Sequence, residues 1–295
     1  MIKLNKIYTF DKMYAKRLIM ETIYSKKELR IDNVKTFDLE QTLLCGQCFR
    51  WKKVDNVFIG IINKRVIKAR QEKNTLFISN ILKKDINDIL LYFDLFADYR
   101  KIKRNLEKIH PVLKEAATYA KGIHILNQDP FETLISFIIS QNNNIPRIEK
   151  IVERLCENFG EEIEDGYYSF PSASTLASLS CDELNVIKAG FRNRYIIDAA
   201  QKVNSGKIDF ENLRTLDYIK AREKLKEIVG VGNKVADCAL LYGLHRMEGF
   251  PMDVWMKRAM ENLFDNMEPE KFGKYAGVAQ QYIFHYSRMH KEIFT

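Results

Sequence analysis

The chain has 295 residues, enough for one large or two ordinary domains with a substantial core. Its 47 Lys and Arg residues exceed its 39 Asp and Glu residues, so the net charge of +8 suits a polyanionic partner without requiring one. No run approaches the roughly 18 consecutive apolar residues of a membrane span, and the N-terminus lacks the apolar core of a signal peptide. We therefore expect a soluble intracellular protein, in the cytoplasm and nucleoid or in the nucleus, with no membrane role.

The N-terminal part of the chain predicts strands. Residues 1–30 are charged and mixed, could include a helix over 11–25, and are expected to form an extension whose role the sequence does not assign. Short β-branched and aromatic runs then alternate with turns that contain Asn and Asp, which is typical of an antiparallel meander. The expected strands are 48–54, 57–62, 65–70 and 76–78.

Helical patterns begin near residue 85 and dominate to the C-terminus. The expected helices are 86–95, 102–119, 130–140, 146–159, 175–179, 182–189, 194–203, 217–229, two around the motif described below, and 275–289. Strands followed by helices indicate the α+β class, with an N-terminal antiparallel twisted β-sheet and a mostly α-helical remainder. We place the sheet-containing domain at 31–120 and the helical region at 121–295.

The five cysteines do not form a recognisable metal site. Cys45 and Cys48 have ligand-like spacing, but no second close pair completes a zinc site. A redox pair and two buried thiols that face different ways both remain open, and we favour the buried thiols. We expect no metal and no other cofactor.

Two glycines around one apolar residue predict a tight turn between two helices in the segment 225–238. Gly230 and Gly232 flank Val231, so the backbone can turn sharply and approach a partner without obstruction from Cβ atoms. Exposed N–H groups at a helix start favour a phosphate oxygen. The segment lacks the third glycine and the preceding strand of a dinucleotide-binding fingerprint, so we reject a Rossmann site.

Lys234 begins the second helix of this hairpin, and Asp253 begins the helix that follows. A helix from Lys234 to residue 244 rises roughly 16 Å, and the link over 246–252 can reach about 23 Å. The chain can therefore double back and bring the amine and the carboxylate to one site. Taken singly, each residue is more simply a surface lysine or an ordinary helix cap.

Further blocks occur at 46–51 (GQCFRW), 140–147 (SQNNNIPR), 190–195 (GFRNRY) and 275–280 (YAGVAQ), the last followed by Phe284. Together with the hairpin, they resemble the 8-oxoguanine branch of the helix-hairpin-helix DNA glycosylase superfamily. The matching segments extend from about residue 37 to residue 287, most of the chain. No cysteine follows Cys238, so the iron–sulfur cluster of another branch is not expected.

The resemblance implies a bifunctional glycosylase and lyase that flips the damaged base out of the duplex. Lys234 matches the lysine that displaces the base, forms a Schiff base with the sugar and nicks the strand by β-elimination. A lysine attacks only as a free amine, so we expect Lys234 to be enclosed once substrate is bound. Because a carboxylate touching the lysine would favour its charged form, we expect Asp253 to cap its own helix and to face the sugar, where it stabilises a cationic transition state.

The resemblance also implies a pocket for the flipped base. Phe284 and Cys238 match the groups on its two faces, and Gln280 matches the amide that reads its Watson–Crick edge. Gly46 matches the glycine whose carbonyl accepts the N7–H that separates 8-oxoguanine from guanine. Tyr242 stands where methionine is common, so the shape of the pocket can differ. Core packing is the alternative role for Phe284.

A second group of residues matches the part of the family that contacts the gap and the orphaned cytosine. Asn142, Arg147 and Arg192 match the residues that fill the gap and grip that cytosine, since arginine donors suit its acceptors. Phe191 matches an intercalating wedge that is commonly tyrosine. Trp255 stands where histidine is common in eukaryotic-type relatives, which puts a charged phosphate contact there in doubt.

The expected partner is double-stranded DNA containing 8-oxoguanine, most suitably opposite cytosine, and the protein is expected to be a monomer. Two alternatives compete with this base-excision repair activity. One is an alkylated-purine DNA glycosylase of the same fold, which works by activated water and leaves the strand intact. The other is a non-catalytic helix-hairpin-helix protein that binds DNA phosphates only.

Overall fold

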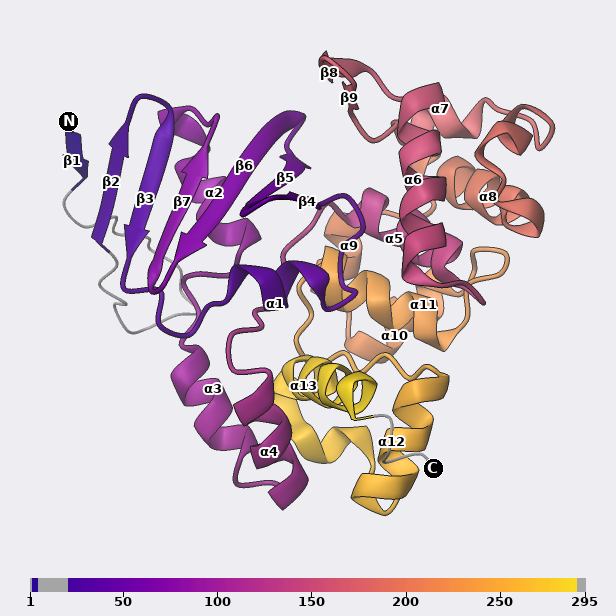
Figure 1. Ribbon diagram of the computed structural model, residues 1–295. Coiled ribbons are helices and arrows are strands. Elements are labelled where there is room, and N and C mark those ends of the chain that lie inside the picture. The colour runs from indigo at the N-terminus through magenta and orange to yellow at the C-terminus, as the bar shows by residue number, and fades with distance from the viewer. Residues whose placement is uncertain (1, 5–20, 291–295) are drawn as a thin grey trace.

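A computed structural model describes residues 2–4 and 21–290, in which a sheet at one side of the molecule adjoins a larger body of helices (Figure 1). Every strand pair of the sheet is antiparallel, and the strand order is β1-β2-β3-β7-β6-β5-β4. The strands are β1 (Ile2–Leu4), β2 (Glu21–Ser25), β3 (Glu28–Asp32), β4 (Lys52–Val54), β5 (Val57–Ile62), β6 (Arg65–Glu72) and β7 (Thr75–Ser79). The predicted meander and the predicted α+β class are confirmed.

Turn chemistry sets the register of this sheet. Asn63 and Lys64 both have positive φ, as a two-residue hairpin turn requires, and they join β5 to β6 where the sequence places the turn. Lys26 and Lys27 join β2 to β3 in the same way. The helix suggested over 11–25 is wrong at 21–25, because β2 gains hydrogen-bonded partners on both sides there. The remainder of that helix lies outside the described residues.

The helical body contains most of the helices that the sequence predicts. Their bounds are α1 (Leu39–Leu44), α2 (Ile86–Tyr92), α3 (Tyr99–Leu106), α4 (Pro111–Tyr119), α5 (Pro130–Ser140), α6 (Ile145–Phe159), α7 (Ala173–Ala177), α8 (Asn193–Asn204), α9 (Phe210–Thr215), α10 (Tyr218–Leu225), α11 (Asn233–Cys238), α12 (Val254–Phe264) and α13 (Ala276–Met289). No helix in the described part of the chain is long and apolar enough to cross a membrane.

Two predicted helices differ from the structure for local reasons. The single helix expected over 102–119 is divided into α3 and α4, because Pro111 begins α4 with His110 as its N-cap. The helix expected over 182–189 is a 3-10 turn, η2 (Glu183–Ile187), closed by Lys188 in the left-handed conformation. A small hairpin of β8 (Glu162–Glu164) and β9 (Tyr167–Tyr168) was not predicted.

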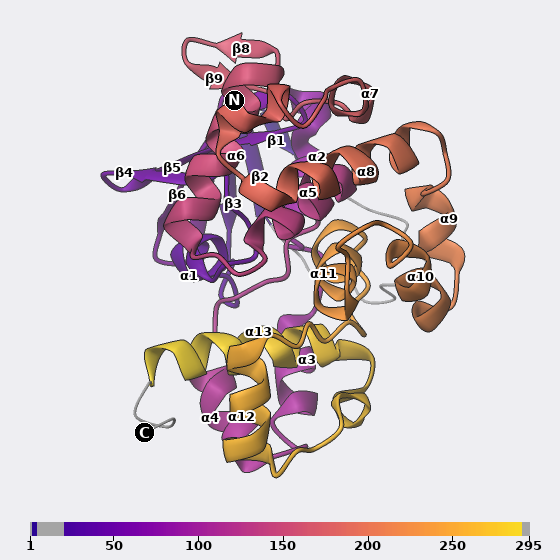
Figure 2. The same cartoon turned by 90° about the vertical axis from the view of Figure 1, so that its right-hand side faces the viewer.

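The described residues form two apolar cores. One lies between the sheet and α2, and the other fills the helical body. Helices α3 and α4 pack in the second core, where α4 contacts α13, so the proposed domain boundary at residue 120 does not coincide with the change from one core to the other. Figure 2 shows α13 beside α11, with α3, α4 and α12 on its other side.

The hairpin between α10 and α11 is held by two contacts. Gly230 has a φ of +79°, and a Cβ atom built on it would lie 2.5 Å from the ring of Tyr195. Asp237 on α11 accepts a 2.7 Å hydrogen bond from the hydroxyl of Tyr218 on α10. The chain then passes through a π-helical turn, η4 (Ala239–Gly243), and doubles back to α12. The turn is therefore fixed by Tyr195, and the two helices are joined to each other away from the turn by the Tyr218–Asp237 bond.

Gly230→Ala should destabilise the protein, because alanine would have to hold a positive φ and its Cβ would press into the Tyr195 ring. We expect urea titration to show a fall of at least about 2 kcal/mol in the free energy of unfolding. Gly232→Ala is the matched control, since Gly232 has a φ of −100° and open space at its Cβ position. It should lose no more than about 1 kcal/mol, the cost of a poorer helix cap. Equal losses in the two variants would contradict this account.

Candidate active site

The amine of Lys234 lies against helix α5. Lys234 follows Gly232, the N-cap of α11, by two positions, and its side chain is half-buried. Its Nζ donates a 3.1 Å hydrogen bond to Oγ of Ser140 and lies 5.0 Å from the centroid of the Phe137 ring. The Ser140 hydroxyl itself donates to the carbonyl of Phe137 at 2.8 Å, so its oxygen is left to accept from the lysine.

Asp253 caps α12, as the sequence analysis expects. Its Oδ1 accepts a 2.8 Å hydrogen bond from the backbone N–H of Met256, and the side chain is half-buried. Among the ion pairs of residues 2–4 and 21–290, none joins Asp253 to Lys234. The carboxylate is therefore held by its own helix rather than by the amine.

The buried thiol of Cys238 connects these two charged groups. Cys238 ends α11 and is only 2% exposed. Burial raises the pKa of its thiol to about 12, the charge of Lys234 opposes that rise, and the charges of Asp237 and then Asp253 add to it. The thiol is therefore neutral at pH 7 and lies within the electrostatic reach of both groups. The amine and the carboxylate thus both influence the same buried thiol.

Tyr242 organises the wall next to Cys238. Its ring stacks on Phe137 with the ring centroids 5.4 Å apart. Its hydroxyl donates to the side-chain oxygen of Gln281 at 2.6 Å and lies 3.2 Å from that of Gln280. The two glutamines lie on α13, so Tyr242 joins the hairpin to that helix.

Gly46 and Phe284 come together from opposite ends of the chain. Gly46 has a φ of +92°, and a Cβ atom built on it would lie 3.7 Å from Cε1 of Phe284 and 3.4 Å from Cδ1 of Ile145. Phe284 is half-buried on α13, so it is not simply a core residue. Buried Gln47 anchors the glycine segment by donating to the carbonyl of His124 at 2.8 Å and accepting from the N–H of Leu126 at 2.9 Å. This wall of the site is therefore rigid.

A second cluster forms where the end of α5 meets the start of α8. Phe191 projects with 53% of its surface exposed, whereas Arg192 is only 3% exposed. Arg192 donates to the carbonyls of Gln141, Asn142 and Ala189, so it holds the turn that displays exposed Asn142. Arg147 is exposed nearby. The pKa of Arg192 is lowered mainly by its own burial and further by the positive charge of Arg147.

The same cluster adjoins the glycine hairpin through one aromatic ring. Tyr195 packs edge-on against Phe191 at 5.8 Å between centroids, and its ring also faces Gly230. The hairpin, the exposed aromatic ring and the asparagine turn therefore share one face of the molecule with the Lys234 site.

Three contributing residues were not assigned a role from the sequence: Phe137, Ser140 and Gln47. Ser140 is the first residue of the 140–147 block, but only the packing of α5 against α11 shows that it contacts Lys234. Phe137 belongs to the apolar run of α5, where nothing in the pattern separates it from core residues. Of the three, the role of Gln47 is the easiest to predict from the sequence, because a glutamine in an apolar segment needs buried hydrogen-bond partners.

The cysteines at positions 45 and 48 are free and buried. Cys45 belongs to the helical core and Cys48 to the sheet core, so the expectation that they face different ways is confirmed. Burial raises the pKa of both thiols, and each donates to a backbone carbonyl. Within the described ranges, no group of three or more His, Cys, Asp or Glu side chains is placed to hold a metal ion.

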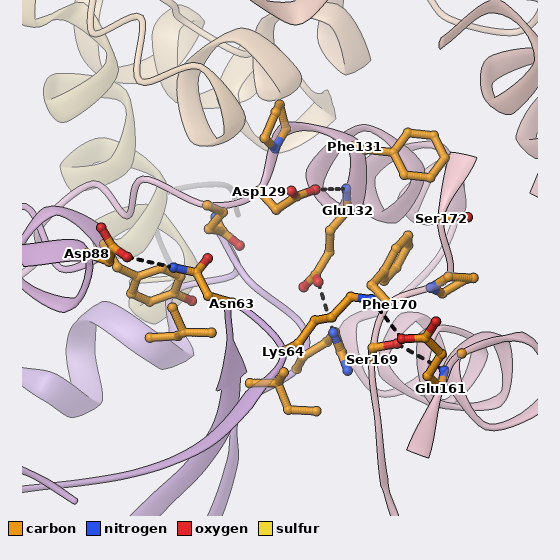
Figure 3. Close-up of a pocket in the computed structure, with 18 of the residues that line it drawn as sticks. Asn63, Lys64, Asp88, Asp129, Phe131, Glu132, Glu161, Ser169, Phe170 and Ser172 are labelled. Carbon is orange, nitrogen blue, oxygen red and sulfur yellow. Dashed lines mark hydrogen bonds and ion pairs between the residues drawn. The ribbon is translucent and has the colours of Figure 1, made fainter. Parts of the chain in front are cut away.

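A separate cavity of about 520 Å³ lies between the sheet and the first turn of α5 (Figure 3). Two ion pairs lie in its lining: Arg50 with Glu132 at 2.9 Å, and Lys64 with Glu161 at 2.7 Å. Burial raises the pKa of Glu132, and the neighbouring Arg50 limits that rise. Neither Lys234 nor any other predicted site residue lines this cavity, so it does not belong to the site described above.

Comparison with known proteins places the chain among DNA glycosylases. Residues 29–134 match the 8-oxoguanine DNA glycosylase N-terminal domain, and residues 135–273 match the HhH-GPD superfamily of base excision DNA repair proteins. The N-glycosylase/DNA lyase of Saccharomyces cerevisiae is 34% identical over 265 residues, which cover 79% of this chain and 68% of that protein.

Solved structures agree with these matches. MBOgg1 in complex with a low-affinity DNA ligand is 41% identical, with a TM-score of 0.88 over 92% of this chain and 99% of that one. The Clostridium acetobutylicum 8-oxoguanine glycosylase/lyase, bound to double-stranded DNA with cytosine opposite 8-oxoG, is 35% identical, with a TM-score of 0.85 over 92% and 98%. A 3-methyladenine DNA-glycosylase from Archaeoglobus fulgidus shares only the fold, at 19% identity and a TM-score of 0.70.

Asp237 makes the stability of the hairpin depend on pH. Burial raises the pKa of its carboxyl from 3.8 to about 6, so the folded state binds a proton more tightly than the unfolded state. Stability from this group is therefore fully present below about pH 4 and is lost as the pH rises through 6. Asp237→Asn cannot ionise, so relative to the parent it should gain on the order of 3 kcal/mol in unfolding free energy between pH 4 and pH 7.

The measurement is urea denaturation of both proteins across that pH range. Tyr218→Phe serves as a directional control, because the Tyr218 hydroxyl lowers the pKa of Asp237. Its removal should move the loss of stability to higher pH. A constant difference between Asp237→Asn and the parent at every pH would contradict the assignment.

Proposed function

This chain belongs to the family of 8-oxoguanine DNA glycosylases, and from that premise we propose the role of each residue in its site. The protein is a bifunctional N-glycosylase and DNA lyase of base excision repair. One observation carries the assignment of its residues. Lys234 and Asp253, at the N-termini of two successive helices, both act on the buried thiol of Cys238 without pairing with each other.

In the proposed reaction, Nζ of Lys234 forms a bond to C1′ of the damaged nucleotide as the bond from C1′ to the base nitrogen breaks. The electron pair of the broken bond leaves with the base. The bound amine then gives up a proton, and the ring oxygen leaves C1′ with its electron pair and takes up a proton, which gives a ring-opened Schiff base. β-Elimination breaks the C2′–H bond, whose proton passes to a base, and the C3′–O bond, whose electron pair leaves with the 3′ phosphate, so the strand is nicked. Ser140 accepts a hydrogen bond from one N–H of Lys234 and so orients the amine, with the lone pair of its nitrogen toward the sugar.

Asp253 stabilises the positive charge that develops on the sugar as the base leaves. Its helix cap supports this role, because the hydrogen bond from Met256 fixes the carboxylate without neutralising it. A direct ion pair with Lys234 would instead hold the amine in its charged, unreactive form. The separation of the two groups is therefore part of the mechanism.

The base pocket is proposed to lie between Cys238 and Phe284, which take the two faces of the flipped 8-oxoguanine. Gln280 reads its Watson–Crick edge, and the carbonyl of Gly46 accepts its N7–H. The contact of Gly46 with Phe284 supports this arrangement, since it places the glycine backbone at the edge of a half-buried ring. Tyr242 shapes the pocket by holding the oxygen of Gln280.

The exposed cluster is proposed to occupy the gap and to recognise the opposing cytosine. Phe191 is the wedge, supported by its exposure, and Asn142 fills the space that the base leaves. Arg147 is the better placed of the two arginines to donate to cytosine, because it is exposed. Arg192 would first have to give up bonds to carbonyls, so we propose that it mainly supports the turn in the free protein.

Backbone N–H groups of Gly230, Val231 and Gly232 are proposed to bind a DNA phosphate, although that of Val231 donates to the carbonyl of Ile228 at 3.1 Å and would first have to give up this bond. The substrate is proposed to be a DNA duplex that contains 8-oxoguanine. The protein is proposed to bind it as a soluble monomer, in the cytoplasm and nucleoid or in the nucleus. The division into a sheet-containing domain at 31–120 and a helical region at 121–295 likewise stays a proposal. The comparisons do not favour an alkylated-purine glycosylase or a non-catalytic DNA-binding protein.

Lys234→Gln should keep DNA binding and lose both base release and strand nicking, because glutamine lacks the nucleophilic amine. The assay uses duplexes that differ only in the lesion and its opposing base. Borohydride should trap the parent protein on 8-oxoguanine DNA and leave the variant untrapped. An active parent protein that yields no trapped adduct would remove the Schiff-base step, and equal rates opposite all four bases would remove the proposed cytosine preference.

Asp253→Asn tests charge separately from helix capping. Asparagine caps a helix about as well as aspartate, so the free energy of unfolding should change by less than about 1 kcal/mol. Base release should slow by about 100-fold or more, because the cationic transition state loses its counter-charge. Near-normal single-turnover rates in a folded variant would refute the role assigned to the carboxylate.

A further inference from the structure

Arg288 lies at the edge of the proposed base pocket. It follows Phe284 by one turn of α13, and its guanidinium carbon is 5.5 Å from the centroid of the Phe284 ring. A Cβ atom built on Gly46 would lie 3.7 Å from Nη1 of Arg288, the same distance as from the Phe284 ring. One face of Gly46 therefore meets both the aromatic ring and a guanidinium donor.

Within residues 2–4 and 21–290, no acidic side chain forms an ion pair with Arg288. The Arg288 side chain is half-buried. Its charge lowers the pKa of the His285 imidazole and opposes the burial that raises the pKa of the Cys45 thiol. A half-buried guanidinium without a carboxylate partner is available to donate to an acceptor on a ligand.

8-Oxoguanine differs from guanine at two adjacent atoms. It carries a hydrogen on N7, which is a donor, and an oxygen on C8, which is an acceptor. Under the proposed function, the carbonyl of Gly46 accepts from N7–H. A site that reads both differences needs a donor beside that carbonyl, and Arg288 is the side chain with free donors that the structure places against Gly46.

We propose that Arg288 is a specificity-determining residue that donates a hydrogen bond to O8 of the flipped base. Guanine in the same position would present C8–H to the guanidinium, which would leave a donor in a desolvated pocket without an acceptor. The Gly46 carbonyl and the Arg288 guanidinium would then read the lesion together. This inference rests on the proposed function, since it requires that 8-oxoguanine occupies the pocket.

The test compares Arg288→Met, which keeps a long side chain against Phe284 and removes every donor, with Lys274→Met. Lys274 is an exposed cation just before α13, over the Tyr275 ring and outside the pocket, so it controls for loss of one positive charge. Each protein is assayed under single-turnover conditions on a duplex with 8-oxoguanine and on a duplex with a preformed abasic site. Both assays are repeated across a range of salt concentrations.

We expect Arg288→Met to slow release of 8-oxoguanine about 10- to 100-fold, the usual effect of losing a charge-assisted hydrogen bond. Nicking of the abasic duplex, which has no base to read, should stay within about twofold of the parent rate, as should both activities of Lys274→Met. The salt dependence should be unchanged. Arg288→Lys, which keeps a donor without the planar fork, should recover part of the lost rate.

Two results would overturn the inference. Equal loss on both duplexes with a weaker salt dependence would assign Arg288 to a DNA phosphate instead. Unchanged release of 8-oxoguanine would show that Arg288 does not contact the base. If the parent protein itself fails to release 8-oxoguanine, the proposed function fails, and that outcome is distinct from a failure of Arg288 alone.

Discussion

The packing of α5 against α11 is the contact on which the rest of the site depends. It places the aromatic ring and the hydroxyl at the end of α5 under the amine of Lys234. It also lets Tyr242, on the π-helical turn after α11, stack on the same ring and bond to α13. A shift of α5 by one turn, roughly 5 Å, would remove the contacts of both Lys234 and Tyr242 with α5 together.

Electrostatic separation is the second feature of the arrangement. Two opposite charges lie near one neutral, buried thiol, and an ion pair between them would be the simplest outcome. Instead, the carboxylate caps α12 and accepts a backbone N–H, and no ion pair between the two groups is found in the described part of the chain. In the proposed reaction the carboxylate thus remains available to the cation that develops on the sugar, and no ion pair holds the amine in its charged form.

The pocket also joins the two ends of the chain. Gly46 comes from the segment that leads into the sheet, whereas Phe284 and Arg288 come from the last helix. Gln47 ties the glycine segment to the link before α5 through two buried hydrogen bonds, to the carbonyl of His124 and from the N–H of Leu126, and to α1 through a third, to the carbonyl of Thr42. If this wall holds the base as proposed, recognition of the base depends on the fold of the N-terminal part.

Local signals in the sequence determined the elements and the motif residues, because turn chemistry, helix caps and hydrophobic period act over a few positions. The Asn63-Lys64 turn and the Asp253 cap are examples that the structure confirms. Contacts between distant segments were decided only by the tertiary structure: Ser140 with Lys234, Arg192 with carbonyls of the 141–142 turn, and β2 in place of a helix. No periodicity along the chain encodes such contacts, since they depend on how whole elements pack.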